Sequence, residues 1–396
     1  MENKENFNPL NRVVYKQNAL IDLSNFAKKY QKILIFTSKA PKNAYFTALS
    51  GFLNDANVTF SVAEINLSGG VSNSQILGCI ARALGYDCLI AFGAGSISDI
   101  TKIVAKELKI PFIVVPTTLS HFGYFSNFAF LKTNLSYKKV ECNYPEKVFI
   151  EENFIKNSPD SFVLSACSFV FSFAECYVSE FIKNKILNTN KFYEINNIKD
   201  IILKTEGLVN WLCLHKDVAY LNLMDNIIEL YSNICKLETD LPCLELSVLN
   251  SLSSPCGNFG KACLVNCKVI LMCYLNFWKD NNLFYKNMPN VEKNLKILEN
   301  NGKNSNFLIN FMKKFKIFTT NKFFLKTKSI KKCALSEVEK MQKKVTLLAL
   351  KLTNNFTAET PSPINLNNAL TNLNYVALTT NCYQLNALMR LGYLNF

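Results

Sequence analysis

Two glycines and a serine separate an apolar run from a helical segment in the stretch AFGAGSISDITK, residues 91–102. Gly93 and Gly95 have no side chain, so the backbone there can approach a phosphate group closely. Ser96 and the backbone amides after it can donate hydrogen bonds at the positive end of the predicted helix. The pattern therefore favours a phosphate or nucleotide cradle. The alternative is a strand-to-helix turn whose glycines serve the fold alone.

Further polar residues lie on that helix and at the end of the next apolar run. Asp99 is expected in the first helical turn, where a carboxylate complements the helix dipole, and Lys102 lies about one turn further on. The run PFIVVPTT places Thr117 and Thr118 at the carboxyl end of a strand, with Ser120 just beyond. Ligands of open α/β sheets bind outside the carboxyl ends of strands. Two neighbouring strand ends of this kind leave room for a dinucleotide.

Alternating strands and helices must position these residues. Apolar runs without alternation, such as CLIAF and FIVV, predict parallel strands that are covered on both faces. Helical segments separate them, and one of these, AYFTALSGFLNDA, is predicted to begin only after a loop KAPKN. From about residue 153 helical spacing dominates. We therefore predict a Rossmann-like, doubly wound α/β domain over residues 1–152 and an all-α domain over residues 153–396.

The composition indicates a globular chain of two domains. It has 396 residues, of which 49% are hydrophobic and 19% charged, and no apolar run long enough for a membrane span. The beginning of the chain has no apolar signal region, so we expect a cytoplasmic protein. The formal net charge of +14 invites a nucleic-acid interpretation, but the lysines are spread out and no aromatic residues alternate with them. We expect no nucleic-acid partner.

The 14 cysteines include no C-x-x-C pair. In a chain without a secretion signal we expect neither disulfides nor a thiolate zinc site, and interpret the cysteines as small buried residues. A metal site around Cys256, Cys263, Cys267 and Cys273 is the alternative.

The segment GAGSISDITKIVAKELKIPFIVVPTTLSHFGYFSN resembles the pattern GGGSxxDxxK … PT … S-x-D-G of glycerol-1-phosphate dehydrogenases. These belong to the superfamily of iron-containing alcohol dehydrogenases, glycerol dehydrogenases and 3-dehydroquinate synthases. The segments NRVVYKQNALIDL, YPEKVFIEENFIKNSP and LTTNCYQLNALMRLGYLNF extend the resemblance toward both ends. It implies a dehydroquinate synthase-like fold, NAD(P) at the glycine turn and the PTT strand, and a phosphorylated substrate such as dihydroxyacetone phosphate. A homo-oligomer is compatible with it.

The residues after the strand KILIFT bear on the choice of cofactor. Ser38 stands at the position expected for the ribose end of the dinucleotide, and Lys39 follows it. An acidic residue there would favour NAD by binding the ribose hydroxyls. Its absence leaves NADP open, because Lys39 could meet the 2′-phosphate.

The sequence departs from the family pattern at the metal and the substrate. The resemblance implies one divalent metal, usually zinc, held by an Asp and two His ligands, which polarises the substrate oxygen. The metal-ligand Asp falls on Phe169, the His-Gly segment best matches Phe259, and the substrate-orienting Asp becomes Phe122. The chain contains two histidines, His121 and His215, and neither fits a ligand segment. We therefore expect zinc to be absent.

Two functions remain open from the sequence. The first is a dehydrogenase in which His121 donates a proton and Lys102 or Lys132 stabilises an oxyanion or binds phosphate. The second is an inactive nucleotide-binding protein that serves as a sensor or a partner subunit. A lyase or cyclase would meet the same objection of a missing metal. A replacement metal site that includes Glu175 and Cys176 also stays open.

Overall fold

The structure is a computed structural model, and it describes residues 9–67, 71–120, 122–132, 137–187, 192–214, 217–237, 267, 339–341, 343 and 344. Of the predicted site residues, His121 and Phe259 lie outside the described residues, as do Cys256, Cys263 and Cys273. For Lys132 and Glu175 the structure describes the backbone and not the side chain.

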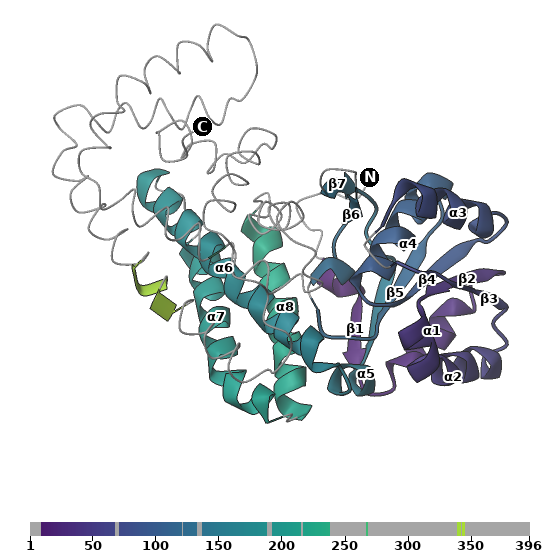
Figure 1. Ribbon diagram of the computed structural model, residues 1–396, viewed down its shortest axis with the longest axis horizontal. Helices are drawn as coiled ribbons and strands as arrows, with labels where there is room; N and C mark the ends of the chain where they lie inside the picture. Colours follow the sequence, from purple (N-terminus) through teal and green to yellow (C-terminus); the bar gives the residue numbers. More distant parts are fainter. Residues whose placement is uncertain are drawn as a thin grey trace, which may run out of the picture. The chain divides into compact units, whose positions relative to one another are not determined.

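A parallel sheet forms the core of the N-terminal region (Figure 1). Its strands are β1 (Val13–Lys16), β2 (Ile33–Thr37), β3 (Phe60–Glu64), β4 (Cys88–Gly93), β5 (Phe112–Pro116) and β8 (Lys147–Glu151), in the order β1-β8-β5-β4-β2-β3. Every neighbouring pair is parallel. Strands β2, β4 and β5 are buried throughout, which explains their apolar sequences. The predicted parallel sheet is confirmed.

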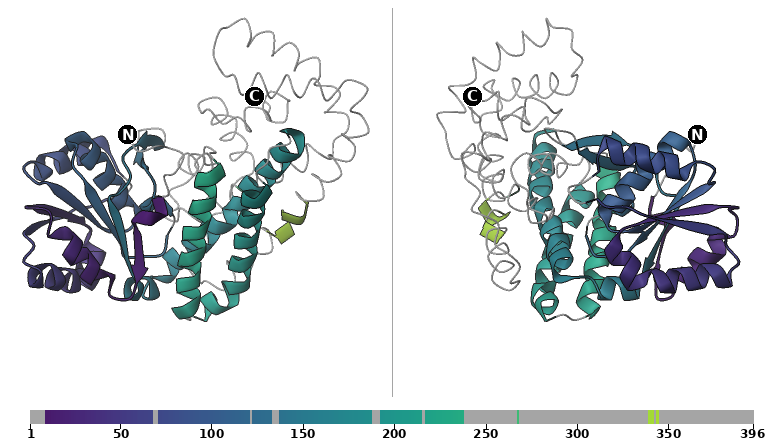
Figure 2. Two further views of the ribbon diagram at one scale, coloured as in Figure 1. Left: turned by 180° about the vertical axis from the view of Figure 1, so that it is seen from behind. Right: turned by 45° about the vertical axis from the view of Figure 1, so that its right-hand side comes forward.

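Helices cover both faces of this sheet, as Figure 2 shows from two further directions. They are α1 (Ala19–Ala27), α2 (Lys39–Asp55), α3 (Asn73–Ala83) and α4 (Gly95–Leu108). Leu23 of α1 and Leu53 of α2 pack in one apolar cluster with Ile90 and Val115 of the sheet. The chain order reverses between β4 and β2, and this is the point at which doubly wound sheets bind ligands.

The predicted loop KAPKN is wrong, because α2 already begins at Lys39. Pro41 therefore lies in the first helical turn, where an amide is not needed for a hydrogen bond within the helix. The consequence is local: Ser38 becomes the residue that precedes the helix, with φ −117° and ψ 169°. Its backbone ends β2 and turns directly into α2.

A short segment and a hairpin, neither predicted, connect β5 to β8. The 3-10 helix η3 (Phe122–Tyr124) is followed by the antiparallel strands β6 (Phe128–Lys132) and β7 (Tyr137–Glu141). After β8, the short helix α5 (Glu152–Lys156) leads out of the sheet.

The described residues beyond α5 are helical, as predicted. They form α6 (Asp160–Leu187), α7 (Phe192–Cys213) and α8 (Asp217–Leu237). None of the described helices has the length and apolarity needed to cross a membrane. The cysteines whose side chains are described form no disulfide, and all except Cys235 are buried.

The chain divides into two compact units. One comprises residues 1–170 and 204–235, and the other residues 171–203 and 236–396. In the second unit, the Cys267 thiol lies 4.0 Å from the Phe171 carbonyl, and the Lys199 ammonium lies 5.4 Å from the centre of the Tyr177 ring. The domain boundary between residues 152 and 153 stays a prediction.

Candidate functional site

A pocket of about 440 Å³ opens at the carboxyl ends of three strands, and we call it the strand-edge pocket. Ser38 and Lys39 reach it from the end of β2, Glu64 and Asn66 from the end of β3, and Ser96 from the start of α4. Ser38, Lys39 and Ser96 are three of the predicted cofactor residues, although 58 positions separate the first from the last. The volume falls within the range of about 300–1,000 Å³ typical of small-molecule sites.

No described side chain caps the start of α4, which lies at this pocket. Ala94 precedes the helix and cannot cap it with a side chain. Its carbonyl accepts the amides of Ile97 and Ser98 at 3.0 and 3.3 Å, so the amides of Gly95 and Ser96 lie ahead of the first helical bonds. Ser96 is exposed, and its hydroxyl lies at the same end. Because the helix dipole makes this end positive, an anionic group is favoured there.

Asp99 does not lie in the first turn of α4, contrary to the prediction. The helix begins at Gly95 rather than at Ser96, so its first turn holds no acidic residue. The positive end of the helix therefore has no carboxylate from its own first turn. An external anion would meet no competing negative charge from that turn.

Gly93 also has a structural reason to be glycine. A Cβ built on Gly93 would lie 3.1 Å from Cγ1 of Ile97, closer than ordinary packing allows. The carbonyl of Gly93 accepts the amide of Thr117 at 3.3 Å and so joins the ends of β4 and β5. The glycine turn thus serves the fold and the pocket together.

Glu64 is a pocket residue that the sequence did not single out. Its carboxylate lies 3.0 Å from the Lys42 ammonium, and both side chains are about two-fifths exposed. An ion pair this open contributes little to stability because water screens it. It does place a carboxylate in the same pocket as Lys39, with the Lys42 ammonium paired to that carboxylate. An acid at the end of the run VTFSVAE was the available signal.

Thr117, Thr118 and Ser120 lie outside this pocket and are buried. The Thr118 hydroxyl lies 3.4 Å from the Tyr124 hydroxyl, which also donates to the Thr118 carbonyl at 3.2 Å. Burial raises the pKa of Tyr124 to about 12, so the phenol stays neutral, although the hydrogen bonds with Thr118 and Ser120 act against this shift. The hydroxyl of Thr118 is therefore already engaged by the protein.

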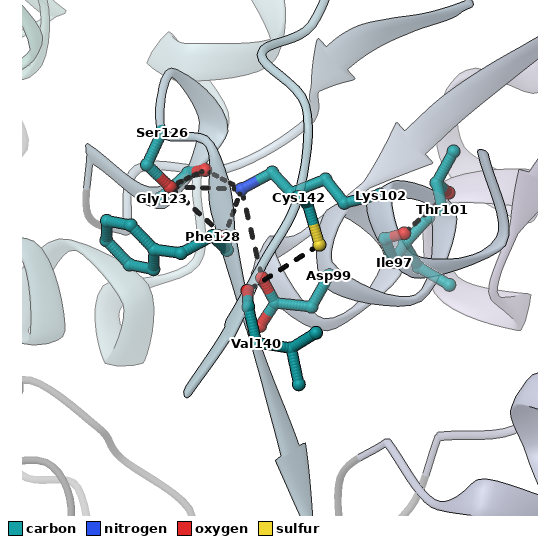
Figure 3. Close-up of polar contacts among 9 residues, drawn as sticks. All are labelled: Ile97, Asp99, Thr101, Lys102, Gly123, Ser126, Phe128, Val140 and Cys142. Carbon is teal, nitrogen blue, oxygen red and sulfur yellow. Dashed lines mark hydrogen bonds and ion pairs between the residues drawn. The ribbon is translucent and has the colours of Figure 1, made fainter. Parts of the chain in front are cut away.

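Lys102 is wholly buried and holds the segment that follows β5 (Figure 3). Its ammonium donates to the carbonyls of Gly123 and Phe128, to the latter at 2.9 Å, and lies 3.1 Å from the Ser126 hydroxyl. The Asp99 carboxylate is 3.9 Å away. Burial lowers the pKa of Lys102, and Asp99 acts in the opposite direction. Among the described residues, protein oxygens thus surround this ammonium.

Phe122 and Phe169, which the resemblance aligns with acidic residues, lie in a group of four aromatic rings. The Phe122 ring lies 5.0 Å from that of Phe169, edge to face, and 5.0 Å from that of Tyr231. The Phe125 ring adds a contact with Tyr231 at 5.8 Å. All four side chains are buried, and all belong to one compact unit. We call these residues the aromatic cluster.

The described residues of this cluster do not fit a divalent metal. A phenyl ring has no atom that ligates a cation, and burying an unligated dication among such rings is prohibitive. Within the described part of the chain, no group of three His, Cys, Asp or Glu residues is arranged to hold a metal ion. Phe259 lies outside that part, and the absence of zinc stays a prediction.

The N-terminal part of the chain is similar in sequence to known dehydrogenases. Residues 14–159 match the family described as iron-containing alcohol dehydrogenase. The glycerol-1-phosphate dehydrogenase of Methanococcoides burtonii, whose name specifies NAD(P)+, is 27% identical over 157 residues, or 39% of this chain and 43% of that protein. Its counterpart in Archaeoglobus fulgidus is 30% identical over 126 residues, or 32% and 35% of the two chains. The matches thus span less than half the length of either relative.

Solved structures show the same fold at low sequence identity. An alcohol dehydrogenase of an archaeon from a Red Sea brine pool superimposes with a TM-score of 0.61 and 13% identity, over 92% of this chain and 89% of that one. The iron-containing alcohol dehydrogenase of Thermococcus thioreducens gives a TM-score of 0.59 and 14% identity, over 93% and 90%. At this level of identity the likeness establishes the fold.

Proposed function

Because the α/β part of this chain is related to the glycerol-1-phosphate dehydrogenases, within the iron-containing alcohol dehydrogenase superfamily, we propose that it binds NAD(P) at the strand-edge pocket. The observation that carries this proposal is the uncapped start of α4, which opens into a pocket of suitable volume. The amides of Gly95 and Ser96 and the Ser96 hydroxyl would bind the diphosphate. Ser38 would lie at the ribose.

Lys39 supports a preference for NADPH. It is exposed in the same pocket as Ser38, where it can approach a 2′-phosphate. Glu64 would repel that phosphate, but Lys42 at 3.0 Å offsets its charge. The net charge of Lys39, Lys42 and Glu64 is therefore +1. A single exposed contact of this kind is worth about 1 kcal/mol at most, so we expect NADPH to bind about fivefold more tightly than NADH.

Two activities are compatible with this binding. The first is a dehydrogenase activity like the one in the relatives' names. In this chain it would be the reduction of a phosphorylated ketone of the dihydroxyacetone phosphate type. The second is nucleotide binding without turnover, as in a sensor or a partner subunit. A specific observation favours the second: Phe122 and Phe169 pack together where the family pattern has the substrate-orienting and metal-binding acids. Lys102 is held by protein acceptors rather than facing the pocket.

Calorimetric titration of the chelator-treated protein with NADPH and NADH tests the binding. We expect saturable binding of both, with NADPH the tighter ligand, and loss of the difference in Lys39→Ala. Lys28→Ala is the matched control, since Lys28 is an exposed lysine that bonds only to Asn25 among the described residues. Equal affinity of the unaltered protein for the two cofactors would contradict the assignment of Lys39. No binding of either would contradict the proposed site.

Turnover and metal content separate the two activities. We expect no oxidation of NADPH with dihydroxyacetone phosphate, and no stoichiometric zinc in the protein purified without chelator. Measurable turnover would establish the dehydrogenase. Stoichiometric zinc would show that residues outside the described part of the chain hold a metal, and would remove the main argument for an inactive protein.

A further inference from the structure

The residues predicted for the cofactor fall into two groups that the structure treats differently. Ser38, Lys39 and Ser96 line the strand-edge pocket, whereas Thr117 and Thr118 are buried and outside it. The first group corresponds to the ribose and diphosphate of the adenosine part. The second lies at the next strand end, where the other half of a dinucleotide would continue.

Hydrogen bonds within the protein already engage polar atoms of Thr118 and of Leu119, the next residue. The Tyr124 hydroxyl donates to the Thr118 carbonyl at 3.2 Å and lies 3.4 Å from its hydroxyl. The Leu119 amide donates to the Ser158 hydroxyl at 2.8 Å. A nicotinamide amide bound here would have to break these buried bonds, and each lost bond costs about 1 kcal/mol or more.

Lys102 makes it energetically costly for the segment after β5 to move aside. Its ammonium joins α4 to the carbonyls of Gly123 and Phe128, at the two ends of the turn between η3 and β6 (Figure 3). Moving this turn away would leave a buried ammonium without its acceptors. Residues 123–128 are thus anchored to α4.

The aromatic cluster fills the space next to this segment. Phe122 contacts both Phe169 and Tyr231 at 5.0 Å between ring centres, and each of the three side chains is 3% exposed. Aromatic pairs of this geometry add about 1 kcal/mol each beyond the burial of their surface. Making room for the nicotinamide ring would disrupt this packing.

We propose that the strand-edge pocket binds the adenosine diphosphate part of the nucleotide alone and leaves the nicotinamide ring outside the protein. The inference rests on the proposed nucleotide binding and narrows its ligand to a nucleoside diphosphate. Free ADP and ADP-ribose are then ligands as good as NADH. A protein that binds all of them responds to the adenine nucleotide pool and not to the redox state of NAD(P).

Titration with matched ligands tests this. We expect ADP-ribose to bind within about threefold of NADH, and 2′-phospho-ADP-ribose within about threefold of NADPH, because the nicotinamide adds no contact. Nicotinamide mononucleotide should not bind, and the fluorescence of bound NADH should match that of free NADH. Ser96→Ala should weaken ADP-ribose and NADH by the same factor.

The outcomes separate this inference from the one on which it rests. If NADH binds more than about tenfold tighter than ADP-ribose, or if its fluorescence shifts on binding, the protein binds the nicotinamide ring. The inference is then wrong, but the proposed nucleotide binding is unaffected. If none of the ligands binds, the proposed site itself is wrong and the inference falls with it. Phe122→Ala gives a second reading: a gain in NADH affinity without a gain for ADP-ribose would show that the aromatic cluster excludes the ring.

Discussion

The strand-edge pocket and the segment after β5 lie at neighbouring strand ends of one sheet, yet they differ in what satisfies their polar groups. At the start of α4, Ser96 and the first amides face an open pocket. After β5, the hydroxyl of Thr118 and the ammonium of Lys102 are bonded to protein atoms and buried. A ligand can add bonds in the first region, but in the second it must replace existing ones. Ligand binding should therefore respond to substitutions in the first region, and stability to substitutions in the second.

The largest effect is expected for Lys102→Met. The substitution keeps much of the side chain's length but removes the ammonium that donates to two buried carbonyls, and losses of about 3 kcal/mol in the free energy of unfolding are typical. Urea unfolding followed by circular dichroism measures it. Lys106→Met is the control, because Lys106 is on the same helix, is exposed and bonds to the Glu141 carbonyl at 2.6 Å. Equal losses in the two variants would show that burial of Lys102 is not what matters.

Phe169→Asp tests whether the aromatic cluster can be converted into a metal site. The substitution places an acid at the position that the resemblance assigns to a metal ligand, but it removes a ring packed at 5.0 Å from Phe122 and buries a carboxylate. We expect a loss of about 3 kcal/mol in the free energy of unfolding, with no recovery when zinc is added. Phe169→Leu should lose less, about 1 kcal/mol, because an apolar side chain remains. A rise in the melting temperature of Phe169→Asp with zinc would contradict the metal-free interpretation.

Ser96→Ala and Thr118→Ala compare the two regions directly. Ser96 is exposed in the pocket, so its loss should weaken nucleotide binding about fivefold and leave the stability unchanged. Thr118 is buried beside the Tyr124 hydroxyl, so its loss should lower the stability by about 1 kcal/mol and leave nucleotide affinity unchanged. Calorimetric titration and urea unfolding of both variants give the four values. The reverse pattern would mean that Thr118, and not Ser96, faces the ligand.

The sequence was sufficient for the sheet because its buried strands follow a local pattern. Unbroken apolar runs marked the buried strands β2, β4 and β5, and the glycine turn marked the start of α4. The helix start at Lys39 was missed because proline reads as a loop residue unless it is known to occupy a first turn. Glu64 was missed because no local pattern shows that the end of β3 reaches the same pocket as Ser96.

The contacts of Lys102 and of the aromatic cluster could not be predicted from sequence patterns, for a different reason. Lys102 lies three residues after Asp99 in a helix that looks amphipathic. Nothing local shows that carbonyls 21 and 26 residues later accept hydrogen bonds from its ammonium. Likewise, the contact between Phe122 and Tyr231 joins residues far apart in the chain. The family pattern identified Phe122 and Phe169 as departures, but only tertiary packing shows that they contact each other.

The smallest effect is expected at Ser98, one residue before Asp99 on α4. Its hydroxyl is buried and has no hydrogen-bond partner in the described part of the chain. Ser98→Ala removes an unsatisfied polar atom, so stability should stay the same or rise by up to about 1 kcal/mol. Ser126→Ala is the contrast, since its hydroxyl lies 3.1 Å from the Lys102 ammonium and its loss should cost about 1 kcal/mol. A loss at Ser98 as large as that at Ser126 would show that the Ser98 hydroxyl has a partner, and that the polar groups of α4 are satisfied along more of its length than the comparison of the two regions assumes.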